Sequence, residues 1–524
     1  MSRRSRLYLS AFTVGSWTLL SRLTGFFRDI VIAALFGSGP IAEAFQVAFA
    51  LPNLFRRLFA EGTINAAFVP IFSKSLSDKQ EAAEFARNTF SWLTTALIVL
   101  TVAAQVAMPW FVLAIASGFR DDGRFDLAVD FGRICFPYIL FIALASLLSG
   151  ILNSFGRFAA GAAAPVLLNV ILLAAMGMAL ASGIDPGPAL AWGVPVAGIA
   201  QLALMWLACR RTGIRMALHV PRLTPKVRRL AVVAFPAVLA GGVVQVNILV
   251  GRQVASYFDG AIQWLAVADR LYQLPLGVVG IATGIVLLPE LMKRLAEGDH
   301  EGSRDAFNRA TEFSLMLTIP AAFALVVIPF PLVSVLFERG AFTSDDSHAT
   351  AAALAVYGIG LPAFVLQKTL QPLYFSEEDT RTPFRYAVVA MLANAILAIG
   401  LIPLAGYLAA AVGTTLSSWL MVFLLWNGRR RLGEKARVDR RLRSFTPRAL
   451  LASAFMAVVV FGLAELLLPW LTADGIRYAA LAVIVLAGAV AYFGGAIAMK
   501  AISLAELRQV TLNRKLPGDR LGED

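Results

Sequence analysis

Residues 21–29 read SRLTGFFRD and lie inside an apolar stretch, residues 10 to 36, that is long enough to cross a bilayer. This stretch holds two arginines, Arg22 and Arg28. Three more lie in later apolar stretches and are Arg56, Arg57 and Arg270. An arginine at the centre of a membrane helix costs about 2.5 to 3.5 kcal/mol, so five such residues facing lipid would rival the net stability of a typical protein.

We therefore expect these arginines to face a watery cavity or a bound anion. The guanidinium group is always charged, and its fork of donors matches a phosphate through two parallel hydrogen bonds. The sequence thus predicts a membrane protein that handles an anionic cargo.

Composition supports an all-α polytopic membrane protein. Of the 524 residues, 58% are hydrophobic and 15% are charged, and the mean hydropathy is +0.73. Apolar stretches of membrane-spanning length recur along the whole chain. They predict about fourteen transmembrane helices, at 10–36, 41–73, 88–116, 127–153, 160–182, 188–209, 230–257, 263–290, 310–336, 350–375, 384–403, 407–427, 449–470 and 477–499.

The net charge of +13 indicates topology rather than nucleic-acid binding. When the loops between spans are numbered from the N-terminus, one alternating set and the termini hold 34 of the 46 Lys and Arg, and the other set holds four. Positive residues mark cytoplasmic loops, so both termini are expected in the cytoplasm. The first span continues at full membrane length, which argues against a cleavable signal peptide.

Two basic loops divide the predicted spans into groups of six, six and two. We expect an N-lobe at residues 1–220, a C-lobe at 221–430, and a last part at 431–524 with a basic loop, two helices and a cytoplasmic tail. Residues 52–58 and 268–271 place arginine well inside corresponding spans of the two halves. Such a parallel internal repeat is typical of transporters that rock around a central site.

The spacing of Arg22 and Arg28 leaves them about 120° apart on a straight helix. A bend at Gly25 would aim both inward, because glycine weakens helix interiors. The alternative for Arg28 is a simple pair with Asp29, or extension of its side chain to the membrane surface.

The second predicted span contains Pro52, which removes a backbone hydrogen bond. Arg57 and Glu61 are spaced to pair on one face, as a structural ion pair or a functional one, and Arg56 points away as the better ligand candidate. Other charged residues expected in or beside spans are Glu43, Arg252, Asp269 next to Arg270, and Lys368.

Enzymatic signals are missing from the sequence. The three histidines lie in predicted loops, and neither a metal-binding motif nor a glycine-rich phosphate loop is present. We therefore expect a transporter with no catalytic residues, no metal and no cofactor.

Several runs together closely resemble the MurJ (MviN) lipid II flippase family of the MOP exporter superfamily. The runs are residues 21–29, 44–45 with 51–62, 67–70, 268–271 and 379–383. The resemblance covers essentially the whole chain, and its most specific part is the first 75 residues.

The resemblance implies two six-helix lobes around a cavity and two final helices that form a groove for a polyprenyl tail. It implies that Arg22, Arg28 and Arg270 bind the pyrophosphate of lipid II, with Arg56, Glu61 and their neighbours, including Ser21, supporting the cavity. Some members have a sodium site built on carboxylates, whereas this chain offers Gln245, Asn247, Asn394 and Ala398. Sodium coupling is therefore not favoured, and coupling to protons or to the membrane potential is left open.

The resulting hypothesis is a flippase that carries the undecaprenyl-pyrophosphate-linked peptidoglycan precursor to the periplasmic leaflet by alternating access. Its partners would be lipid II, membrane lipids and proteins of cell-wall synthesis. The alternatives are a flippase for another polyprenyl-linked glycan, a drug exporter of the same superfamily, and a non-transporting cell-wall scaffold. Drug export predicts aromatic and acidic cavity walls, and the excess of arginine argues against it. A scaffold role leaves the buried arginines unexplained.

Overall fold

A computed structural model describes residues 3–59, 63–214, 216–282, 288–473 and 475–501. The described residues are almost entirely helical and contain no strand, which confirms the predicted all-α polytopic class. Ten described helical segments are long and apolar enough to cross a membrane. The other four predicted spans, at 10–36, 41–73, 230–257 and 263–290, are helical in their described parts as well.

The chain forms two compact units, each described here by itself. The first unit comprises Met1–Ala266 together with Arg339–Asp346, and the second comprises Val267–Glu338 and Ser347–Asp524. The first unit thus contains residues 221–266 in addition to 1–220, and the lobe boundaries at residues 220 and 430 stay a prediction.

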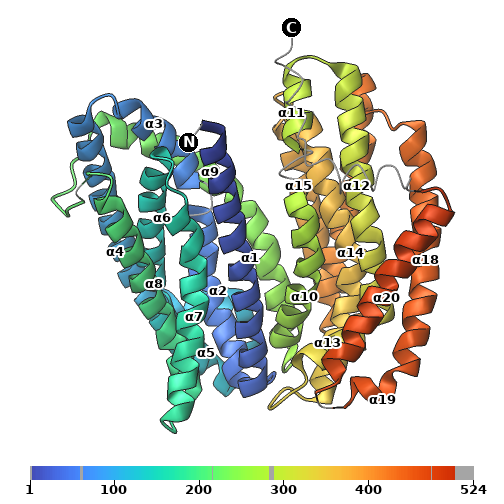
Figure 1. Cartoon of the computed structure of the whole chain (residues 1–524). Helices are drawn as coiled ribbons and strands as arrows, with labels where there is room; N and C mark the ends of the chain where they lie inside the picture. Colours follow the sequence, from blue (N-terminus) through green and yellow to red (C-terminus); the bar gives the residue numbers. More distant parts are fainter. Residues whose placement is uncertain (1–2, 60–62, 215, 283–287, 474, 502–524) are drawn as a thin grey trace. The chain divides into compact units, whose positions relative to one another are not determined.

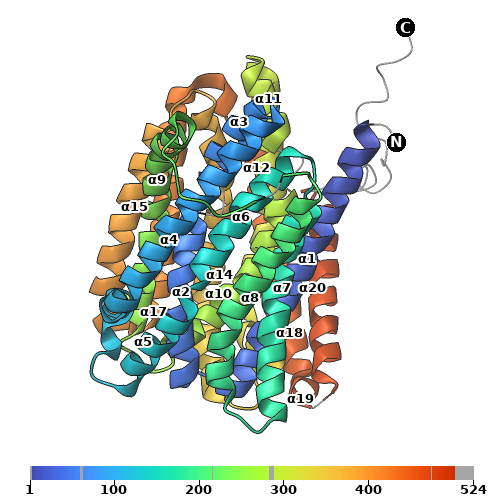
Figure 2. The same cartoon turned by 90° about the vertical axis from the view of Figure 1, so that its left-hand side faces the viewer.

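The first unit consists of helices that pack side by side (Figure 2). Helix α7 packs against both α1 and α8, α2 packs against α5, and α4 packs against α9. The helices are α1 (Arg3–Phe36), α2 (Pro40–Phe59), α3 (Thr63–Ser75), α4 (Lys79–Ala116), the short η1 (Ser117–Phe119), α5 (Gly123–Cys135), α6 (Tyr138–Ser154), α7 (Ala159–Ala181), α8 (Pro186–Arg210) and α9 (Pro225–Ala255).

In the second unit, α12 packs against α18, and α18 packs against α20, as the right-hand part of Figure 1 shows. Helices α15 and α17 form another close pair. The helices are α11 (Leu288–Ala296), α12 (His300–Val327), α13 (Pro329–Phe337), α15 (Arg381–Gly400), α16 (Ile402–Ala405), α17 (Leu408–Gly428), η3 (Arg429–Ala436), α18 (Arg440–Leu466), α19 (Leu468–Leu471) and α20 (Arg477–Ala498). The boundary between the units falls inside α10 (Ala261–Ala282) and α14 (Ser344–Phe375).

Several predicted spans consist of two helices. The span predicted at 127–153 changes helix at Phe136 and Pro137, between α5 and α6, and the span at 310–336 changes helix at Ile328. Pro52, by contrast, lies inside α2, which continues through it despite the missing amide donor. Some helix starts carry a capping side chain, and Asp78 accepts bonds from the amides of Gln80 and Glu81 at the start of α4.

Residues 339–346 pack tightly against the turn between α1 and α2. The amide of Ala341 donates to the carbonyl of Ala34 over 2.8 Å, and the hydroxyl of Ser38 donates to the carboxylate of Asp346. The indole of Trp264 donates to the same carboxylate over 2.7 Å. These bonds anchor the segment to three separate parts of the first unit.

Gly37 makes this close packing possible. Its φ is +58°, and a Cβ added there would overlap the carbonyl oxygen of Ala341. We expect Gly37→Ala to lower the stability by more than about 1 kcal/mol, because alanine is strained in the left-handed region and the backbone opposite cannot move aside. The unfolding midpoint of the purified protein measures the loss. Gly177→Ala is the matched control, since nothing lies within 4 Å of its added Cβ and helical alanine is favourable; an equal effect of both changes would contradict the prediction.

Candidate anion site on helix α1 and the family of the chain

The predicted site residues are divided between the two units. Those of the first unit are Ser21, Arg22, Arg28, Asp29, Glu43, Arg56 and Arg252, and those of the second are Asp269, Arg270 and Lys368. The side chain of Arg57 and the whole of Glu61 lie outside the described residues, so their predicted pairing stays a prediction.

Arg28 is buried, and its guanidinium is held by two neighbours. Its Nε and Nη2 donate to one carboxylate oxygen of Asp29 over 3.0 and 2.6 Å, and its Nη1 donates to the side-chain oxygen of Asn169 over 2.9 Å. The pair with Asp29, which the sequence offered as the alternative for Arg28, is therefore present, and the side chain does not extend to the surface. Guanidinium has five N–H donors, and these bonds use three of them. One donor on each terminal nitrogen is left, and N–H groups of guanidinium are donors that a phosphate accepts from.

Asn169 of α7 fixes this arrangement, although it was not among the site residues predicted from the sequence. Its amide nitrogen donates to the carbonyl of Ser21 over 3.1 Å and to the hydroxyl of Thr24 over 3.2 Å. Gly25 permits the contact, because an added Cβ would stand 3.2 Å from the same amide nitrogen. The available signal was a single asparagine in an otherwise apolar predicted span.

Arg22 lies in a different environment from Arg28. Helix α1 is continuous from Arg3 to Phe36, and Arg22 is exposed on it. Among the described residues, no carboxylate lies within ion-pair distance of its guanidinium. Gly25 thus serves close packing against α7 inside an unbroken helix, and the two arginines differ in exposure, since Arg28 is buried and Arg22 is not.

Glu43 and Arg124 form a buried ion pair in the first unit. The Arg124 Nη1 lies 2.8 Å from a carboxylate oxygen of Glu43, whose other oxygen accepts from the amide of Ile262 over 3.1 Å. Arg124 also pairs with Asp122 over 2.6 Å and with Asp259 over 2.9 Å. The pair joins the starts of α2, α5 and α10. Arg124 was missed because its position just before an apolar stretch indicated a loop residue.

The remaining site candidates differ in exposure. Arg56 is partly buried and its Nε donates to the side chain of Asn53 over 3.1 Å. In the second unit, Arg270 is half-buried, its neighbour Asp269 accepts from Gln273, and Lys368 is exposed. Arg252 is half-buried near the end of α9.

Carboxylates and other metal ligands do not gather in the part of the chain that the structure describes. No group of three or more histidine, cysteine, aspartate or glutamate side chains there is arranged to hold a metal ion. Asn394 is fully buried, while the side chains of Gln245 and Asn247 lie outside the described residues.

The helical architecture and the arginines within spans define a multi-pass membrane transporter. The fold is similar to that of a solved structure of "Lipid II flippase MurJ, inward closed conformation", with a TM-score of 0.77 and 23% identity over 92% of this chain and 98% of that one. It is also similar to an inward-facing multidrug resistance MATE family transporter of the MOP superfamily, with a TM-score of 0.66 and 14% identity over 81% of this chain and 98% of that one.

Sequence comparison identifies the particular family. Residues 32–481 match the model of the family described as "Lipid II flippase MurJ". A probable lipid II flippase MurJ of Rhizobium meliloti is 45% identical, covering 86% of this chain and 85% of that protein. One of Rhizobium tropici is 40% identical over 96% of both chains, and the lipid II flippase MurJ of Burkholderia cenocepacia is 36% identical over 82% and 84%. The chain belongs to the MurJ lipid II flippase family.

Proposed function

We propose that this protein moves lipid II, the undecaprenyl-pyrophosphate-linked peptidoglycan precursor, from the cytoplasmic to the periplasmic leaflet of the bacterial inner membrane. Family membership supports lipid II as the cargo. The observation that carries the mechanism is Arg28, which is buried inside a span yet keeps two N–H donors for a phosphate. Both termini would lie in the cytoplasm, as the distribution of basic residues favours.

Arg22, Arg28 and Arg270 would hold the pyrophosphate, with Arg56 and the neighbouring polar side chains supporting them. Asp29 and Asn169 would position Arg28, because their bonds fix the plane of its guanidinium. Alternating access would then expose the bound headgroup first to the cytoplasm and next to the periplasm. Proteins of cell-wall synthesis that supply or consume the lipid II cargo would be partners.

The energy for translocation would come from the membrane potential or from a proton gradient. Coupling to sodium is not favoured. The potential is worth about 2.3 kcal/mol per charge for each 100 mV. With the inside negative, it favours expulsion of the pyrophosphate anion and return of the cationic empty site. Collapse of the potential at constant pH is expected to slow translocation, and sodium removal is expected to leave it unchanged.

The test is depletion of the protein in a strain without a second flippase. An externally added toxin that cleaves the lipid II headgroup then reports how much precursor has reached the outer leaflet. We expect cleavage to stop and precursor to accumulate inside, with rescue by the wild type but not by Arg270→Ala.

The matched control is Arg120→Ala, which removes an exposed arginine of a loop and should rescue fully. Equal amounts of each variant in the membrane must be verified by immunoblot. Normal cleavage after depletion would reject lipid II as the cargo and favour another polyprenyl-linked glycan, a drug or a scaffold role. Rescue by Arg270→Ala would reject the arginine site while keeping the cargo.

A further inference from the structure

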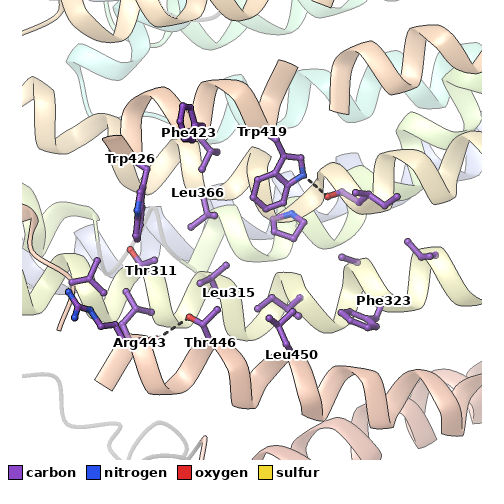
Figure 3. Close-up of a pocket in the computed structure, with 18 residues that line it drawn as sticks. Thr311, Leu315, Phe323, Leu366, Trp419, Phe423, Trp426, Arg443, Thr446 and Leu450 are labelled. Carbon is purple, nitrogen blue, oxygen red and sulfur yellow. Dashed lines mark hydrogen bonds between the residues drawn. The ribbon is translucent and has the colours of Figure 1, made fainter. Parts of the chain in front are cut away.

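The second unit contains a cavity of about 740 Å³ between α12, α14, α17 and α18 (Figure 3). Its walls are formed by apolar side chains that include Leu315, Phe323 and Leu366. Two indoles also line it, Trp419 and Trp426. The hydroxyls of its two threonines donate to backbone carbonyls of their own helices, so the walls offer little hydrogen bonding to a ligand.

The cavity is partly open to the surface of the second unit. Its rim includes Phe423 at 63% exposure and Ile359 at 54%. No side chain of α20 lines it. It is therefore a different place from a groove between the last two membrane helices, which would need α20.

One end of the cavity is positively charged. Arg443 of α18 lines it there, and the guanidinium of Arg429 stacks 4.1 Å from the ring centre of Trp426. The charges of Arg430 and Arg443 act repulsively on Arg429. The Nε of Arg429 is buried without a hydrogen-bond partner, which is a costly state that an anion would relieve.

Nearby carboxylates are committed to other arginines. Glu312 pairs with Arg309 and with Arg441, and Asp439 pairs with Arg309. Glu434 pairs with Arg437 over 3.0 Å. Within the described part of the chain, no carboxylate lies within ion-pair distance of Arg429, Arg430 or Arg443. The uncompensated positive charge is thus gathered at the one end of the apolar cavity.

We propose that this cavity binds one anionic glycerophospholipid of the cytoplasmic leaflet, with an acyl chain among the apolar walls and the phosphate on Arg443 and Arg429. The Nη1 of Arg429 donates to the carbonyl of Ala436 over 2.6 Å, but neither Arg429 nor Arg443 has a carboxylate partner among the described residues. An apolar cavity that ends in such guanidinium groups matches an acyl chain joined to a phosphate. The inference rests on the proposed topology, in which the basic loop that contains η3 lies on the cytoplasmic side together with both termini. The bound lipid would tie α17 to α18 across the bend at η3.

Brominated lipids test the proposal, because bromine on an acyl chain quenches an indole that it touches. The full-length protein is reconstituted into phosphatidylcholine vesicles that contain increasing fractions of brominated phosphatidylglycerol or, in parallel, brominated phosphatidylcholine. We expect the anionic lipid to quench more at low mole fraction. The extra quenching by the anionic lipid should vanish in the Trp419→Phe, Trp426→Phe double variant, although seven other tryptophans remain in that variant.

Charge variants complete the test. Arg443→Gln should raise the half-saturating fraction of phosphatidylglycerol about fivefold, the effect of roughly one basic residue near a membrane surface. Arg440→Gln is the matched control, since Arg440 is exposed on the same helix but does not line the cavity. Equal quenching by the two lipids, or equal weakening by the two substitutions, would overturn the proposal. Either result leaves the flippase proposal intact, because binding is measured without translocation.

Discussion

Arg28→Gln is expected to weaken the binding of lipid II by about 100-fold and to abolish rescue in cells depleted of the wild type. The two N–H donors that Asp29 and Asn169 leave unused are the ones available to the pyrophosphate. Hydrogen bonds to charged groups contribute about 1.5 kcal/mol or more each. Two of them amount to roughly 3 kcal/mol, which is about 100-fold in the dissociation constant. Titration of the purified protein with lipid II measures the change.

Arg28→Lys is expected to fail almost as completely, although it keeps the charge. An ammonium group is a point charge and cannot contact Asp29, Asn169 and a phosphate in one plane. Asn169→Leu keeps Arg28 but removes its support, so we expect an intermediate loss of binding. Size-exclusion chromatography must show that each variant remains folded. Wild-type affinity of the lysine variant would show that Arg28 acts only through its charge.

Arg124→Met is expected to destabilise the protein by about 3 to 5 kcal/mol. Glu43 is 1% exposed, and without Arg124 its carboxylate would keep only the amide of Ile262 among the donors described above. Removal of one partner from a buried ion pair leaves a charge that the surroundings cannot solvate. Thermal unfolding of the purified protein in detergent is expected to show a large fall in the midpoint.

The double variant Glu43→Leu, Arg124→Met separates the cost of the orphaned charge from the value of the pair. We expect it to be more stable than Arg124→Met alone, because an apolar pair carries no desolvation penalty. Arg120→Met, which changes an exposed arginine just before α5, should have almost no effect. If the double variant were the less stable one, the buried pair itself would stabilise the fold beyond charge compensation.

The sequence predicted the spans well because membrane helices have a simple physical requirement. About twenty consecutive apolar residues must satisfy their own backbone bonds, and this pattern is local. The same reasoning located Arg28, since a charge within such a stretch needs a compensating partner. Its partner Asp29 is adjacent in the chain and was likewise predictable.

Partners that are distant in the chain could not be predicted in this way. Asn169 is 141 positions from Arg28, and Glu43 is 81 positions from Arg124. Their contacts depend on which helices become neighbours, and hydropathy carries no information about that. The breaks at Phe136 and Ile328 were missed for a related reason, because the apolar run continues through each change of helix.

The packing of residues 339–346 against the rest of the first unit also determines when that unit can complete its folding during synthesis. Residues 1–266 emerge from the ribosome first, but the carboxylate of Asp346 that accepts from Ser38 and Trp264 follows only after residues 267–338. At about 5 to 20 residues per second, the 80 residues from Ala266 to Asp346 take roughly 4 to 16 seconds. The amino-terminal half must therefore wait in the bilayer, with its Ser38 and Trp264 donors lacking that acceptor, until part of the second half has been inserted.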